Sequence, residues 1–236
     1  MEHKNIFIVL FFLVFQTHAQ TVIFDELLQK HVSNTGVVDY ESFKKDESKL
    51  DNYISFLEKT SPANSWSKNK QKAFWINVYN AYTIKLILEN YPLKSILDIK
   101  KKGETAWTIP FVKVDNTTYT LDHIEHEILR KTLFDPRIHV GVNCASSSCP
   151  KLGNIAFTEQ NIEASLEQLM TAFINDSSRN KLSKNTIEIS PIFEWFQEDF
   201  TKNGTLIDYL NRYSKTKINL IAKVSYLKYD WSLNSK

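Results

Sequence analysis

The 236-residue chain has few of the residues that loosen or crosslink a polypeptide, with five glycines and two cysteines. Scarce glycine together with abundant aromatic residues, 13% of the chain, favours a packed globular domain over disorder. The lysines are scattered, and no dense basic cluster is interleaved with aromatic residues, so nucleic acid is not an expected partner. Repeats, low-complexity stretches and proline- or glycine-rich linkers are also lacking, which indicates a single domain.

Long apolar runs are scarce too, and the one at the N-terminus, Ile6–Phe15, has the features of a targeting signal. It follows Lys4, precedes small residues that end at Ala19, and falls short of the roughly 20 residues that a membrane-spanning helix needs. This pattern predicts a cleaved signal peptide over residues 1–19 and an exported protein, periplasmic or extracellular. We expect residues 20–236 to form one soluble globular domain without membrane association.

Both cysteines lie in one short segment that begins at His139 and ends at Pro150. Small polar residues separate Cys144 from Cys149, and a loop of this kind is a common place for a reacting group. Two cysteines in an exported protein indicate a disulfide, which would shape the loop more than stabilise the fold. The alternative is that one or both are free thiols with a chemical role.

Hydrophobic periodicity predicts a mainly helical α+β domain with a central buried helix and a small, short-stranded β-sheet. Helices are expected over 24–32, 50–57, 70–90 and 122–130, from 158 to 173, from 190 onward, and over 204–213. Short strands are expected over 109–114, 118–121, 137–142 and 186–189. Asp122 is the expected N-cap of the helix that runs to Arg130.

The helix over 70–90 is apolar nearly all round, yet Asn77 and Asn80 fall on an apolar face. A buried amide without partners costs roughly 1–3 kcal/mol, so both side chains must be hydrogen-bonded. They either brace a neighbouring loop or orient catalytic or ligand groups, and bracing the Cys144 loop would satisfy both interpretations.

On the helix over 122–130, Glu125 lies in the middle of the apolar arc, whereas His123, His126 and Arg130 fall on the opposite side. A carboxylate that faces a core needs a partner or must be protonated. Glu125 is therefore a candidate functional residue.

These residues suggest a thiol nucleophile at Cys144, with His139 as its base and Glu125 as the group that orients the base. Ser146, Asn143 and the loop amides are candidates to stabilise an oxyanion. Alternation along a strand points residues 139 and 144 to opposite faces, so they meet only if the chain turns at Asn143. The competing interpretation is a Cys144–Cys149 disulfide beside a structural histidine.

Three further possibilities have less support. A tetrahedral metal site would need four ligands, and His123, His126, His139 and a cysteine are the candidates. No tight ligand motif is present, so we expect no metal and no cofactor. Acid–base chemistry on sugars needs a carboxylate pair, and the pattern singles out only Glu125. The aromatic tail over 226–234, with Trp66, Trp107 and Trp195, would suit a binding rim, although packing into the core is the preferred interpretation.

Five segments resemble, in order, the family called domain of unknown function 547. They are Gly36-Val37-Val38-Asp39-Tyr40, Phe74-Trp75-Ile76-Asn77-Val78-Tyr79-Asn80-Ala81-Tyr82-Thr83, Ile124-Glu125-His126-Glu127-Ile128-Leu129-Arg130, the His139–Pro150 segment, and Tyr229-Asp230-Trp231-Ser232-Leu233-Asn234. The family occurs as an exported bacterial domain and at the C-terminus of plant proteins, and its name records no activity. The resemblance emphasises Asn77, Asn80, Glu125, Arg130, His139, Asn143, Cys144, Ser146 and Cys149.

Two hypotheses therefore stay open. The first is a thiol-dependent hydrolase with catalytic Cys144, His139 and Glu125, in which pocket residues Asn77, Asn80, Arg130, Asn143 and Ser146 position the loop or the substrate. The second is a binding or scaffold domain with a structural disulfide. The expected partner is a small molecule, a peptide or a glycan.

Overall fold

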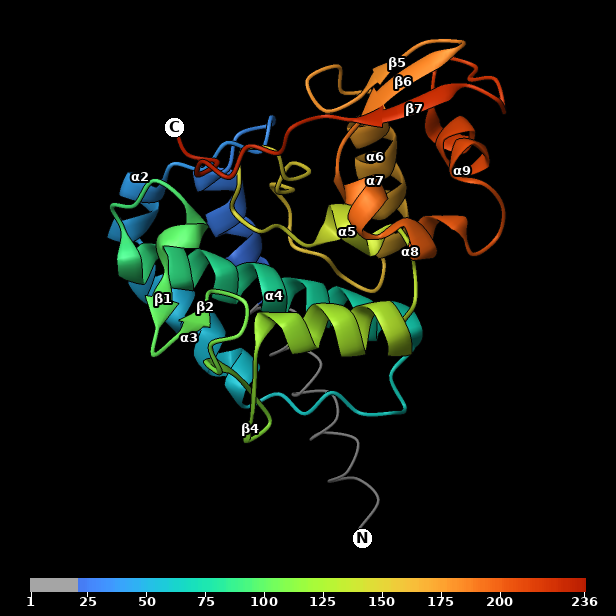
Figure 1. Cartoon of the computed structure of the whole chain (residues 1–236). Coiled ribbons are helices and arrows are strands. Elements are labelled where there is room, and N and C mark those ends of the chain that lie inside the picture. Colours follow the sequence, from blue (N-terminus) through green and yellow to red (C-terminus); the bar gives the residue numbers. More distant parts are fainter. Residues whose placement is uncertain (1–20) are drawn as a thin grey trace, which may run out of the picture.

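In the computed structural model, which describes residues 21–236, helix α4 (Lys68–Asn90) runs through the middle of the protein (Figure 1). Ser67 caps it by accepting a hydrogen bond from the Lys70 N–H at 3.1 Å. Its side chains are buried on all sides over most of its length, as the apolar sequence predicted. The predicted signal peptide lies outside the described residues.

The first core surrounds α4 and contains most of the N-terminal half of the domain. The elements of this half are a helix over 21–31, α2 (Tyr40–Lys45), α3 (Glu47–Glu58), η1 (Ile96–Asp98), η2 (His123–Thr132) and α5 (Ile138–Gly141). Two hairpins flank them: β1 (Lys100–Lys101) with β2 (Glu104–Thr105), and β3 (Val112–Val114) with β4 (Thr117–Tyr119). Phe24 stacks on Tyr53 across this core, with ring centroids 4.7 Å apart.

A second core lies under a three-stranded sheet in the C-terminal half. Its helices are α6 (Ile162–Ile174), α7 (Ile192–Trp195), α8 (Gln197–Thr201) and α9 (Leu206–Tyr213). In the sheet, β6 (Thr186–Ile189) pairs antiparallel with β5 (Lys181–Leu182) and parallel with β7 (Lys223–Tyr226). Among residues 21–236, every helix is too short or too polar to cross a bilayer.

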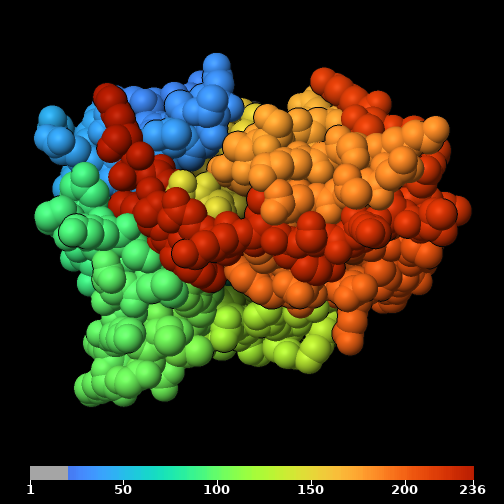
Figure 2. All heavy atoms as spheres, turned by 45° about the horizontal axis from the view of Figure 1, so that its top comes forward, coloured from blue at the N-terminus to red at the C-terminus, as the bar shows by residue number. Residues whose placement is uncertain are grey.

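The chain after β7 joins the two halves of the domain. It leaves the sheet and runs back over the N-terminal half, where Figures 1 and 2 show it in red. Along this path Ser232 bridges to Ser95, Leu233 to Ser146, and Ser235 to Val38. The tail therefore lies directly on the cysteine loop.

The structure confirms an α+β fold that is mainly helical, although its short strands are divided among three small sheets. The expected strand over 137–142 is wrong, because Ile138–Gly141 forms the helical turn α5. A short apolar run that is buried on all sides shows no period that separates strand from helix. A Cβ atom added to Gly141 would lie 3.0 Å from side-chain atoms of both Ile76 and Leu166, so this turn packs closely between α4 and α6.

The helix over 122–130 also differs from expectation, because η2 is a π-helix in which the Leu133 N–H donates to the Ile128 carbonyl. Asp122 does not cap it, so that prediction is wrong. Asp122 already has helical dihedral angles, and the Thr120 hydroxyl accepts from the His123 N–H at 3.0 Å instead.

Asn80→Ala should lower the free energy of unfolding by about 2–4 kcal/mol, because it leaves two buried backbone groups without partners. The Asn80 amide donates to the Gly141 carbonyl at 2.8 Å and accepts from the Asn143 N–H at 2.9 Å. Urea denaturation measures the change. Asn90→Ala, at the exposed end of the same helix, is the control and should change stability by less than about 0.5 kcal/mol. Equal effects would contradict a bracing role for Asn80.

Candidate active site

The loop that carries both cysteines is held together by the side chain of Asn143. Its Nδ2 donates to the Pro150 carbonyl at 2.8 Å, and its Oδ1 accepts from the Ala145 N–H at 2.9 Å. Ala145 has a φ of 57°, a left-handed conformation that costs a non-glycine residue about 1–2 kcal/mol. Asn143 therefore ties the start of the loop to its end and stabilises the strained residue between them.

The C-terminal tail fixes the outer side of this loop through backbone hydrogen bonds. The Ser147 N–H donates to the Ser232 carbonyl at 2.6 Å, and the Ser148 N–H donates to the Asp230 carbonyl at 3.1 Å. These bonds place Tyr229 next to the first cysteine.

The Cys144 thiol is surrounded by hydrogen-bonding groups. Its Sγ lies 3.1 Å from the Ser146 Oγ and 3.4 Å from the Tyr229 hydroxyl, and these two hydroxyls lie 2.8 Å apart. The Cys144 N–H donates to the Cys149 Sγ at 3.3 Å, and the two thiols also hydrogen-bond to each other. Both cysteines are free thiols in the structure, so the Cys144–Cys149 disulfide stays a prediction.

The surroundings move the pKa values of the two thiols in opposite directions. The hydrogen bond from Cys149 lowers the pKa of Cys144 to about 7; burial opposes it, and the hydroxyls of Ser146 and Tyr229 assist it. Burial and the neighbouring Cys144 hold the pKa of Cys149 well above its usual range. Above about pH 7 the pair therefore holds a thiolate at Cys144 and a thiol at Cys149.

Cys144 opens into a cavity of about 220 Å³ with mostly apolar walls. One wall is a cluster of rings in which Trp195 stacks on Trp231 at 5.9 Å and Tyr229 lies 4.5 Å from Trp231. The lining residues are Tyr79, Trp107, Asp122, Glu125, His126, His139, Val142, Cys144, Cys149, Ile192, Trp195, Phe196, Tyr229 and Trp231. The aromatic tail thus does both: Leu233 is buried in the first core and Trp231 packs against it, as the preferred interpretation expected, while Tyr229 and Trp231 also line the cavity.

His139 belongs to a charged network behind the same cavity. Its Nε2 pairs with the Asp199 Oδ2 at 2.7 Å, and its ring stacks on Phe196 at 4.1 Å. Arg130 holds Asp199 through two nitrogens, at 2.6 and 3.2 Å. Burial lowers the pKa of His139 although Asp199 opposes this shift. Burial resists ionisation of Asp199, but hydrogen bonds from His139 and Arg130 prevail and lower its pKa to about 2.

Glu125 is buried against the cavity, and burial raises its pKa above the usual range while the Tyr79 hydroxyl beside it opposes the shift. The wider turns of the π-helix bring His126 to the cavity together with Glu125, whereas an α-helical wheel separates them. The Nδ1 of His126 lies 3.0 Å from Arg130. A buried carboxyl of this kind is able to donate a proton inside the cavity.

The structure brings Cys144, His139 and Glu125 to one cavity, but it pairs His139 with Asp199 and not with Glu125. Asn80, Asn143 and Ser146 hold the cysteine loop, whereas Asn77 bonds to both backbone groups of Phe157, at 2.7 and 3.0 Å. Arg130 anchors Asp199. No hydrogen bond joins His139 to Cys144 within residues 21–236.

Sequence reasoning missed Asp199, which lies on the five-residue helix α8 among other charged residues. Its partners are 60 and 69 residues away along the chain, so no local pattern marks it. Tyr229 belongs to a segment that the family resemblance covered, but its contact with Cys144 spans 85 residues.

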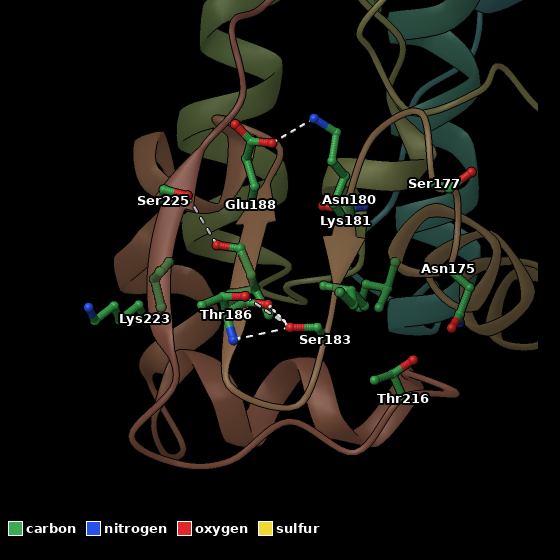
Figure 3. A pocket seen from close by; sticks show the side chains of 14 residues that line it. Asn175, Ser177, Asn180, Lys181, Ser183, Thr186, Glu188, Thr216, Lys223 and Ser225 are labelled. Carbon is green, nitrogen blue, oxygen red and sulfur yellow. Dashed lines mark hydrogen bonds and ion pairs between the residues drawn. The ribbon is translucent and has the colours of Figure 1, made fainter.

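A larger hollow of about 910 Å³ lies over the sheet β5–β6–β7 (Figure 3). Four of its polar side chains pair with one another: Lys181 binds Glu188 at 2.6 Å, and Ser183 contacts Thr186 at 3.0 Å. Its lining contains neither cysteine nor histidine, whereas the smaller cavity is lined by both. Within the described residues, no three histidine, cysteine or acidic side chains converge as metal ligands would.

Residues 63–174 match the model of a family described as "Protein of unknown function, DUF547". The match includes Glu125, His139 and both cysteines, and it ends before Asp199 and Tyr229. No curated protein and no solved structure has significant similarity to the chain.

Glu125→Gln should make the protein more stable at pH 8 but not at pH 4. The raised pKa of Glu125 means that the unfolded chain loses this proton first, so the wild type loses stability as pH rises above about 4.3. Glutamine removes that loss. Urea denaturation at both pH values measures it.

Glu127→Gln is the matched control, because exposed Glu127 pairs with Lys131 at 2.6 Å and its pKa is lowered. Glu127→Gln should slightly lower the free energy of unfolding at pH 8, which is the opposite of the change expected for Glu125→Gln. A Glu125→Gln variant that is less stable than the wild type at pH 8 would contradict a buried, protonated carboxyl.

Proposed function

This chain belongs to the DUF547 family, and we propose that it is a thiol-dependent hydrolase with Cys144 as its nucleophile. The family description assigns no activity. One observation carries the proposed function: the Cys144 thiol, with its lowered pKa, faces the same apolar cavity as the His139–Asp199 pair. A nucleophile and a positioned histidine in one cavity are the parts that acyl transfer needs.

Each step uses groups that line the cavity. The Cys144 thiolate attacks the carbonyl carbon of an ester, thioester or amide, and the hydroxyls of Ser146 and Tyr229 stand beside the sulfur as donors to the oxyanion. The carbon–heteroatom bond then breaks, and the leaving group takes its proton from the buried Glu125. His139 next takes a proton from water, whose oxygen attacks the acyl carbon. The carbon–sulfur bond breaks, Cys144 leaves as the thiolate, and the proton on His139 returns to Glu125.

Asp199 has the role that the sequence hypothesis gave to Glu125. It accepts from one ring nitrogen of His139 and favours the positive charge that the ring carries after it takes a proton. Arg130 keeps Asp199 ionised and fixed, so Arg130 and Asp199 are positioning residues.

The cavity also limits what can enter it. At about 220 Å³ it is smaller than the cavities of about 300–1,000 Å³ that enclose whole ligands, so it accepts one group of a larger substrate. Its aromatic walls, Trp107, Trp195 and Trp231, favour an apolar group or the flat face of a sugar.

The alternative is a binding or scaffold domain whose Cys144–Cys149 disulfide shapes the loop. The Cys149 Sγ lies 3.3 Å from the Cys144 backbone nitrogen, and this proximity supports the alternative because the two sulfurs need little movement to form a disulfide. A reduced protein without a reactive thiol would favour this alternative. Export also stays a prediction.

The alkylation rate of Cys144 by iodoacetamide should follow a titration with a midpoint near pH 7. Cys149, buried and with a raised pKa, should stay unlabelled. Peptide mapping by mass spectrometry identifies the labelled cysteine. Cys144→Ala should abolish labelling, and a midpoint near the ordinary 8.5 would contradict an activated nucleophile.

Tyr229→Phe tests the source of that activation, since it removes a hydroxyl that contacts the Cys144 sulfur. The pH midpoint of Cys144 alkylation by iodoacetamide should move to higher pH. Tyr226→Phe, on β7 and outside the cavity lining, should leave it unchanged.

With p-nitrophenyl acetate as a probe ester, we expect a burst of nitrophenol that matches the protein concentration, followed by slower turnover. His139→Gln should keep the burst and slow the turnover by about 10²–10⁴-fold, because it removes the base for deacylation. His123→Gln, a change at an exposed histidine outside the cavity lining, should alter neither phase. An equal burst from Cys144→Ala would rule out Cys144 as the nucleophile.

A further inference from the structure

Cys149 is a buried nucleophile that the hydrolytic steps do not use. Its side chain is 5% exposed, and it lies against Cys144 with a hydrogen bond between the two thiols. Cys144 is only half-buried and lines the cavity. Both cysteines border the cavity, but Cys144 is the more exposed of the two and Cys149 is nearly buried.

We propose that Cys144 and Cys149 form an exchanging dithiol that reduces the disulfides of small thiols and is itself oxidised to an internal disulfide. This second activity rests on the proposed function in one respect only, namely that the Cys144 thiol is reactive.

The exchange balances in two displacements. The Cys144 thiolate attacks one sulfur of a substrate R–S–S–R, forms a mixed disulfide and releases R–S⁻. Cys149 then loses its proton to the released thiolate or to the solvent, attacks the Cys144 sulfur and expels the second R–S⁻. The two protein thiols are oxidised to one disulfide, and the substrate disulfide is reduced to two thiols.

The loop supports this order of attack. Four residues separate the cysteines, and the bonds of Asn143 to Pro150 and Ala145 draw the two ends of the loop together. The lowered pKa of Cys144 suits the attacking thiol, and the raised pKa of Cys149 suits a second thiol that stays protonated until a mixed disulfide forms. With two cysteines in the whole chain, only one internal product exists.

Oxidation also has a consequence for hydrolysis. The internal disulfide consumes the Cys144 thiolate, so the oxidised protein has no acyl acceptor. The same two sulfurs therefore permit hydrolysis when reduced and prevent it when oxidised.

The test exposes the reduced full-length mature protein to oxidised glutathione and measures intact mass after an acid quench. The wild type should lose two hydrogen atoms and keep no adduct. Cys149→Ser, which retains a hydrogen-bond donor beside Cys144, should accumulate one glutathionyl group. Cys144→Ser should show neither change. Circular dichroism and urea denaturation check that the variants fold, and Cys149→Ala serves as a second variant without the resolving thiol.

A wild type that keeps a glutathionyl group on Cys144, or that shows no change in mass, would overturn the exchanging dithiol. Iodoacetamide labelling of the same reduced sample separates the two proposals. Labelling at Cys144 without an internal disulfide means that only the dithiol fails, whereas unreactive Cys144 in both experiments means that the hydrolase fails as well. Loss of the nitrophenol burst on oxidation, and its return with dithiothreitol, would support the link to hydrolysis.

Discussion

The side-chain amide of Asn80 is the interaction on which the site depends. It joins the buried helix α4 to the Gly141 carbonyl and the Asn143 N–H, the two backbone groups that lead into the cysteine loop. Because α4 is packed on all sides, the position of the loop is set by the main core and not by local turn preferences. The side chain of Asn143 then holds the loop itself. Its Oδ1 also accepts a hydrogen bond at 3.2 Å from the Asn234 amide of the C-terminal tail.

Burial opposes the ionisation of the two thiols and of the Glu125 and Asp199 carboxyls, and the neighbouring hydrogen-bond donors decide whether each pKa rises or falls. Cys144 and Asp199 are buried with strong donors beside them, and both have lowered pKa values. Glu125 and Cys149 are buried with weaker compensation, and both have raised pKa values. The cavity therefore holds a thiolate and a carboxylate next to a carboxylic acid and a thiol, which separates groups that accept protons from groups that donate them.

The sequence was informative wherever a local period decides the structure. It predicted α4, the burial of its two asparagines and the burial of Glu125, because each follows from apolar spacing along one helix. It was wrong about α5, whose apolar run is enclosed on every side. It predicted the helix η2, but it did not predict the wider π-helical turns, which no residue pattern indicates. Asp199 and Tyr229 reach the site through contacts that span 60 and 85 residues, and such distances lie beyond any periodicity.

The C-terminal tail also sets an order of events during synthesis. Cys144 leaves the ribosome 85 residues before Tyr229, and Cys149 and the bracing Asn80 of α4 also precede Tyr229. Until then the loop lacks its bonds to Asp230 and Ser232, and the Cys144 sulfur lacks one of its hydroxyl neighbours. The thiol therefore acquires its full environment late, so a nascent chain or a truncated fragment carries a cysteine of more ordinary reactivity.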